Sequence, residues 1–366
     1  MRTLALVLGG ALALAATALV CSGASAQALK DVKPRAPLTL ADQGSFYVGG
    51  HKVHSTARTG GRAGSGARYT DPPFQEGEWT VDQMYVQFQT PVNAKRHLPV
   101  VMTHGCCLSA KTWETTPDGR MGWSEYFVRK GRATYLTDQV GRARSGFDAT
   151  PYNMARQGKI APETIPTVNM ATEQMAWWVF RIGPKPGEAF ADQRFPMAYI
   201  DQMWKQVIPD LSAAVATPTP TLARLGELST DLGGAVLIGH SQSGFFPQGA
   251  ALSDPKGVRA MISLEPGGCS AATLKDAEWA ILAKIPSIIV FGDHLGDIPL
   301  TNWTDAYKDC SVYVEKIKSM GGDATMLSLP AIGIKGNGHM FMQDNNSLEI
   351  ADLMLTWIDE HVERKR

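Results

Sequence analysis

The chain has 366 residues, of which 44% are apolar and 19% are charged, and its 35 basic residues balance its 35 acidic ones. A chain with this much apolar surface to bury is not intrinsically disordered. Its neutral charge balance leaves no electrostatic footprint for nucleic acid or for an anionic membrane. We therefore expect a globular protein that binds neither of these partners.

The first 26 residues have the features of a secretory signal peptide. An arginine precedes an apolar stretch over residues 4–20, and small residues follow at 24–26. The stretch is too short to span a membrane, and no later stretch approaches the roughly 18 uninterrupted apolar residues that a span needs. Val20 is too bulky to precede a lipidated cysteine at Cys21. We predict cleavage after Ala26, no lipid anchor, no membrane span, and a periplasmic or secreted protein.

Cleavage would leave four cysteines, an even number that suits disulfide formation in an oxidising compartment. They are Cys106, Cys107, Cys269 and Cys310, and four cysteines allow three pairings. A Cys269–Cys310 bridge would close a loop of about 42 residues and stabilise the fold by about 4 kcal/mol through loop entropy. The adjacent pair does not suit tetrahedral zinc coordination. We hypothesise a strained vicinal disulfide there, because such strain persists at functional sites.

Strand and helix signals alternate along most of the chain. Two stretches rich in aromatic and β-branched residues, 44–53 and 83–89, predict a first pair of strands. Short apolar runs typical of buried parallel strands follow at residues 98–103, 133–138, 235–240, 260–265, 287–293 and 324–330. Helical segments separate them, among them 123–130, 222–229 and 346–363. The pattern predicts a mostly parallel α/β sheet flanked by helices, in a single domain over residues 27–366.

Residues 147 to about 220 interrupt this alternation. They carry a group of large apolar side chains: Met175, Trp177, Trp178, Phe180, Phe190, Phe195, Tyr199 and Trp204. One interpretation is a satellite hydrophobic cluster that packs the insertion onto the sheet. The other is a lid whose aromatic side chains line a pocket for apolar groups. The two are compatible, and we expect a lid in which most of the aromatic residues form the lid's own core.

A tight turn with a serine at its apex follows the apolar run at 235–240. The sequence Gly239-His-Ser-Gln-Ser-Gly places small residues two before and two after Ser241, which such a turn requires because it is too tight for bulky ones. A serine exposed in this way at the carboxyl edge of a sheet is typical of a catalytic nucleophile. The alternative is a Gly/Ser-rich turn without catalysis. We favour Ser241 as a nucleophile.

A serine hydroxyl needs a base to accept its proton, and in this arrangement the base follows the nucleophile in the chain. The histidines beyond the serine turn are His294, His339 and His361. His339 lies in a glycine-rich loop after the last strand, where a base is needed, whereas His361 lies in the charged terminal helix. We predict that His339 is the base. The alternative is a loop histidine hydrogen-bonded only to the backbone.

Two carboxylates that end neighbouring strands compete for the third role. Glu265 and Asp293 both lie at the sheet edge that carries the serine, and chain order permits either to orient His339. Topology taken alone favours Asp293. An oxyanion hole also requires two backbone N–H groups. We assign them to Gln242, directly after the nucleophile, and to Cys106, in the loop after the strand at 98–103.

Five motifs, spread through nearly the whole mature chain, together resemble those of a known family. They are His104-Gly-Cys-Cys-Leu-Ser, Trp113-Glu-Thr-Thr-Pro-Asp-Gly-Arg-Met-Gly-Trp, His240-Ser-Gln-Ser-Gly, Glu265-Pro-Gly and His339-Met-Phe-Met-Gln-Asp. Together they resemble the bacterial esterase 713 group, a small branch of the α/β-hydrolase superfamily. The resemblance implies the α/β-hydrolase fold, a vicinal disulfide and a homodimer. It also implies a Ser241–His339–Glu265 triad with Cys106 and Gln242 as oxyanion hole, which reverses the topological preference for Asp293.

The expected activity is that of a serine carboxylic-ester hydrolase that acts through an acyl-enzyme on a small to medium, partly apolar ester, with no metal or organic cofactor. A lactonase with the same triad is the alternative among hydrolases. From a different class, a non-catalytic periplasmic binding module would use the same scaffold, although every catalytic role has a candidate residue. A metal site formed by His104, Cys106, Cys107 and His240 is a weaker alternative.

Overall fold

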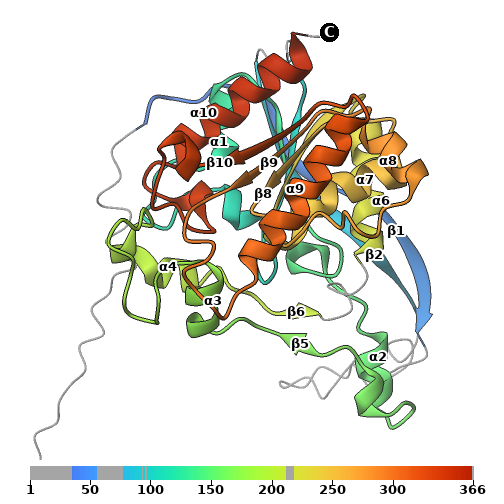
Figure 1. Cartoon of the computed structure of the whole chain (residues 1–366). Helices are drawn as coiled ribbons and strands as arrows, with labels where there is room; N and C mark the ends of the chain where they lie inside the picture. Colours follow the sequence, from blue (N-terminus) through green and yellow to red (C-terminus); the bar gives the residue numbers. More distant parts are fainter. Residues whose placement is uncertain (1–34, 56–76, 93, 95–96, 212–217, 365–366) are drawn as a thin grey trace, which may run out of the picture.

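An eight-stranded sheet with the order β1-β2-β4-β3-β7-β8-β9-β10 organises the chain in the computed structural model (Figure 1). The structure describes residues 35–55, 77–92, 94, 97–211 and 218–364. The strand β2 (Gly77–Pro91) pairs antiparallel with β1 (Leu40–Ser55) and with β4 (Thr134–Asp138). From β4 onward, each strand of this sheet pairs in parallel with the next one in the order. These strands are β3 (Val100–Thr103), β7 (Ala235–His240), β8 (Val258–Leu264), β9 (Ser287–Phe291) and β10 (Ala324–Ser328). The predicted mostly parallel α/β fold is confirmed.

Helices cover both faces of the central strands, which is why these strands read as uninterrupted apolar runs. Alternate residues of β7 enter different cores: Val236 and Ile238 join one hydrophobic cluster, and Ala235 and Leu237 join the other. The first cluster packs under α1 (Trp123–Arg129) and α10 (Ser347–Ile358). The second packs under α6 (Thr219–Asp231), α7 (Phe246–Ser253), α8 (Asp276–Leu282) and α9 (Trp303–Ser319). Figure 1 shows the two groups of helices on either side of the sheet.

The insertion between β4 and α6 consists of short elements gathered below the sheet in Figure 1. They are α2 (Thr150–Arg156), β5 (Val168–Asn169), α3 (Glu173–Val179), α4 (Ile200–Trp204) and β6 (Asp210–Leu211). Trp177, Phe180 and Phe195 are buried in the first hydrophobic cluster. The Phe180 carbonyl also accepts the N–H of His339 at 2.9 Å. These aromatic residues therefore pack the insertion onto the sheet edge, while Met175 remains 55% exposed.

A disulfide joins Cys269, in the loop after β8, to Cys310 in α9. It ties a loop on the active edge of the sheet to a helix of the second cluster. Among the residues that the structure describes, no helix has the length and apolar character to cross a membrane. The predicted signal peptide, residues 1–26, lies outside the described residues.

Candidate active site

Ser241 begins a tight turn directly after β7, at the carboxyl end of a central strand. Its φ of 59° lies in the left-handed region, a strained conformation for a residue with a side chain. A Cβ added to Gly239 would lie 1.9 Å from the Ser243 carbonyl oxygen, so only glycine fits there. Ser243 Oγ accepts the His240 N–H and donates to the Thr103 carbonyl, both at 2.9 Å. The structure thus presents the serine on a strained strand-to-helix turn.

His339 lies fully buried in the loop between β10 and α10. Its Nδ1 contacts Glu265 Oε2 at 3.1 Å, while its Nε2 has no hydrogen-bond partner among the described residues. The ring packs against those of His240 and Trp303, with centroids 4.6 and 4.3 Å away. Because His240 directly precedes the serine, this packing places the imidazole beside the turn that carries Ser241.

Asp293 holds the loop of His339 rather than its ring. Its Oδ1 accepts the His294 N–H at 2.8 Å, and its Oδ2 accepts the Gly336 N–H at 3.1 Å. Glu265 reaches the imidazole instead, from a backbone φ of 50° directly after β8. The geometry therefore favours Glu265 over the topological choice.

Arg181 is a residue of the site that sequence reasoning missed. It follows α3 in the insertion, is fully buried, and donates to Glu265 Oε1 at 2.6 Å and to the Asp293 carbonyl at 2.8 Å. No motif marks it. The one sequence signal for it is its position at the end of the apolar stretch 177–181. A charged residue in such a stretch is rarely buried without a partner of opposite charge, so its position indicates a buried ion pair.

Burial and charge act in opposite directions on these two titratable groups. Burial raises the pKa of Glu265, but the Arg181 guanidinium and His339 outweigh this effect and lower the pKa to about 2. Burial lowers the pKa of His339 below its usual 6.5, and Glu265 offsets only part of this effect. At neutral pH the carboxylate is therefore ionised and the imidazole is neutral, which are the states that an orienting acid and a general base require.

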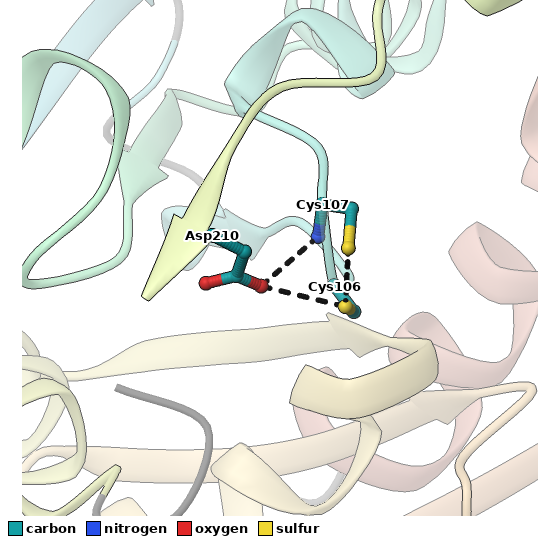
Figure 2. Close-up of side chains that lie close together, drawn as sticks. All are labelled: Cys106, Cys107 and Asp210. Atoms are coloured by element: carbon teal, nitrogen blue, oxygen red, sulfur yellow. Dashed lines mark hydrogen bonds between the residues drawn. The ribbon is translucent and has the colours of Figure 1, made fainter. Parts of the chain in front are cut away.

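Cys106 and Cys107 form the turn after β3, here called the cysteine turn. Their Sγ atoms lie 2.7 Å apart, whereas a disulfide measures about 2.05 Å. The hypothesised vicinal disulfide is not formed in this structure, which holds both residues as free cysteines. The buried Asp210 instead accepts the Cys106 thiol at 3.4 Å and the Cys107 N–H at 3.2 Å through one oxygen (Figure 2). This carboxylate fixes the turn from the insertion side.

A buried arginine connects the cysteine turn to the residue after Ser241. Arg142 forms an ion pair with Asp210, and its guanidinium also donates to Gln242 Oε1 at 2.5 Å. The turn itself lies against the serine, because a Cβ added to Gly105 would lie 2.8 Å from Ser241 Cβ. The two backbone segments assigned to an oxyanion hole are therefore held together by one network.

Comparison with known proteins identifies the family of the chain. The chain is 44% identical to a bacterial esterase of known structure, over 89% of this chain and 98% of that protein, with a TM-score of 0.81. The chain belongs to this family of bacterial esterases. The enzyme is also 26% identical to a probable secreted lipase from a fungal species, over 82% of this chain and 92% of the relative. No family model matches the chain. The protein is thus a carboxylic ester hydrolase with the α/β-hydrolase fold.

The four residues of the alternative metal site do not gather around one point in the esterase. The His104 ring is engaged with the main chain on both sides, donating to the Gly105 carbonyl at 2.8 Å and accepting the Gln139 N–H at 3.2 Å. His240 Nε2 donates to the His339 carbonyl at 2.9 Å. Among the described residues, the group that lies at metal-ligand spacing from the thiols of Cys106 and Cys107 is the Asp210 carboxylate.

Proposed function

We propose that the esterase is a serine hydrolase in which Ser241, His339 and Glu265 act as a catalytic triad. The observation that carries the proposal is the contact between His339 Nδ1 and Glu265 Oε2 at 3.1 Å. It leaves Nε2 neutral, buried and free for the serine proton. The Ser241 Oγ–His339 Nε2 hydrogen bond is not formed in this structure, and such contacts tighten when substrate binds.

The reaction then proceeds in two halves. Ser241 Oγ attacks the ester carbonyl while His339 Nε2 takes its proton, and the imidazolium returns this proton to the leaving alcohol. Water repeats the same steps on the acyl-enzyme and releases the acid. Glu265 stabilises the imidazolium in both halves and stays ionised because Arg181 neutralises it.

The amides of Cys106 and Gln242 are proposed to hold the developing oxyanion. The Cys106 amide makes no hydrogen bond within the described part of the chain and is available to a ligand. The Arg142–Asp210 pair fixes both segments before substrate arrives. Donors that are oriented in advance stabilise the transition state without reorganisation at the moment of reaction.

Hydrolysis of p-nitrophenyl esters from acetate to dodecanoate, beside five- and six-membered lactones, tests this function. We expect the linear esters to be hydrolysed, with the best rates for short to medium acyl chains. We also expect a fluorophosphonate to label Ser241 once per chain and to stop hydrolysis. Turnover of lactones alone would support a lactonase, and binding without turnover would support a non-catalytic binding module.

We also propose that the cysteine turn closes to a vicinal disulfide after export. A thiol–disulfide oxidant would take two electrons and two protons from the pair as the S–S bond forms. The bond would rigidify the turn so that the Cys106 N–H points at the oxyanion. Thiol alkylation followed by intact mass is expected to find no free thiols in protein recovered from the oxidising compartment.

Removing both adjacent thiols is expected to slow catalysis. A Cys106→Ala, Cys107→Ala double variant should lose about 2.7–4 kcal/mol of transition-state stabilisation, seen as a fall in kcat of about 10²–10³-fold. The matched control is Cys269→Ala, Cys310→Ala, which should keep kcat and lose up to about 4 kcal/mol of unfolding free energy in urea. Full kcat in the first variant would refute a role for the vicinal bond.

The remaining expectations rest on the sequence pattern and, for the homodimer, on the resemblance. We propose one domain over residues 27–366, with residues 147–220 as its cap, export to the periplasm or medium, and assembly as a homodimer. The description of the fungal relative as secreted supports export. The packing of the insertion on the loop of His339 supports its role as a cap.

A further inference from the structure

The insertion and two loops at the sheet edge line an open cavity of about 650 Å³, which is within the size range of ligand pockets. The apolar part of its wall comes from the insertion: Phe147, Tyr152, Val168, Ile208, Pro209 and Leu211. A second cavity of about 290 Å³ adjoins it and shares Phe147, Tyr152 and Leu211. The rings of Phe147 and Tyr152 contact edge to face at 5.7 Å. This aromatic pair therefore lies between the two spaces.

Most charged side chains on the wall of the larger cavity are already neutralised within the protein. Asp138 accepts the Ala110 N–H at 2.8 Å and the Arg144 guanidinium at 2.6 Å. Arg142 is paired with Asp210. Lys111 keeps its charge, and its Nζ donates to the Thr115 carbonyl at 2.6 Å. What the wall offers to a ligand is therefore chiefly apolar surface, and burying an apolar group there is favourable.

The larger cavity adjoins the segments assigned to the oxyanion hole. Arg142 lines it and also donates to Gln242 Oε1. Ile208 lines it while its N–H donates to the Cys107 carbonyl at 2.9 Å. Figure 2 shows β6, the next part of this wall, beside the cysteine turn. The wall of the cavity is thus joined through Arg142 and Ile208 to both segments assigned to the hole.

We propose that the larger cavity binds the apolar group of the ester and that the Phe147–Tyr152 pair sets the longest chain it accepts. The proposal rests on the proposed serine hydrolase function and adds the substrate class, an ester with one uncharged alkyl or aryl group. The uncharged alkyl or aryl group that enters the cavity belongs either to the acyl part or to the alcohol part of the ester. The pair acts as an end wall because it separates the space that the group fills from the second cavity.

Two ester series distinguish these sources: p-nitrophenyl esters from acetate to dodecanoate vary the acyl chain, and acetates of primary alcohols vary the alcohol. Phe147→Ala joins the two cavities and should raise kcat/KM for long chains relative to short ones by about ten-fold or more. Leu211→Trp fills the space and should lower the ratio of kcat/KM for medium chains to kcat/KM for p-nitrophenyl acetate by a similar factor. The series that responds identifies the bound group.

Met175→Ala is the matched control, because this exposed apolar residue of the insertion lines neither cavity. Its chain-length profile should match the wild type. If Leu211→Trp does not fold by circular dichroism, Val168→Trp fills the same cavity from a position that is 56% exposed. Unchanged profiles in both series, with acetate hydrolysis intact, would overturn the proposal. Absence of ester hydrolysis in the wild type would instead refute the proposed function.

Discussion

Replacing Ser241 with alanine is expected to abolish ester hydrolysis, with kcat falling by about 10⁴-fold or more. The change removes the attacking oxygen and leaves nothing for His339 to activate. It should spare stability, because alanine keeps the backbone of the turn and both stabilising contacts of Ser243. The measurement is the initial rate on p-nitrophenyl butyrate at several enzyme concentrations, together with thermal unfolding.

Ser319→Ala provides the matched control for this substitution. Trp303, which packs on His339, begins α9, and Ser319 ends it. The Ser319 hydroxyl donates to the Lys316 carbonyl and makes no other hydrogen bond to the described residues. Its variant should hydrolyse esters at the wild-type rate. Equal activity of the Ser241→Ala and wild-type proteins would show that the nucleophile is another residue.

Glu265→Gln is expected to lower kcat by about 10⁴-fold, whereas Asp293→Asn should stay within about ten-fold of the wild type. A glutamine amide donates to His339 Nδ1, so the proton moves to Nε2 and the ring no longer accepts one from the serine. The Asp293→Asn change removes no contact to the imidazole, since the hydrogen bonds of the Asp293 carboxylate within the described residues are to backbone N–H groups. The comparison is made by kcat at neutral pH; loss confined to the Asp293 variant would reverse the assignment.

The glutamine variant also changes stability, and a further substitution separates the two effects. Arg181 would remain buried without its carboxylate, which costs about 3–5 kcal/mol of unfolding free energy. Adding Arg181→Met removes that isolated charge and should restore part of the stability without restoring activity. Recovery of both would mean that Glu265 matters for folding alone.

The strands and the serine turn were predictable because their signals are local. The run Ala235–His240 is apolar throughout since helices cover both faces, and β7 has the predicted bounds. The serine turn was visible because Gly239 and Ser243 are the small residues that it needs. His339 followed from chain order and from its glycine-rich loop.

The rest of the site depends on contacts between distant parts of the chain, which periodicity does not encode. Glu265 and Asp293 end neighbouring strands, and periodicity does not distinguish them. The contact of Glu265 with His339, its backbone conformation and the position of Arg181, 84 residues away in the chain, do so in the structure. The position of Asp210 beside the cysteine turn spans 103 residues. In the insertion, most of the aromatic residues were expected to be core, and Trp177, Phe180 and Phe195 are buried in the first hydrophobic cluster. The residues that line the larger cavity, among them Phe147 and Tyr152, were not singled out, because periodicity does not show how the insertion folds.

The origin of Arg181 has a consequence for engineering and evolution of the enzyme. The sheet supplies Glu265 and the insertion supplies its counter-charge, so the two parts carry halves of one buried ion pair. If a different insertion were grafted here to alter substrate preference, Glu265 would be left as a buried carboxylate without a counter-charge, unless the new insertion placed an arginine at the same position. The insertion therefore carries both residues that line the larger cavity and the arginine that neutralises Glu265. It cannot be exchanged as an independent module.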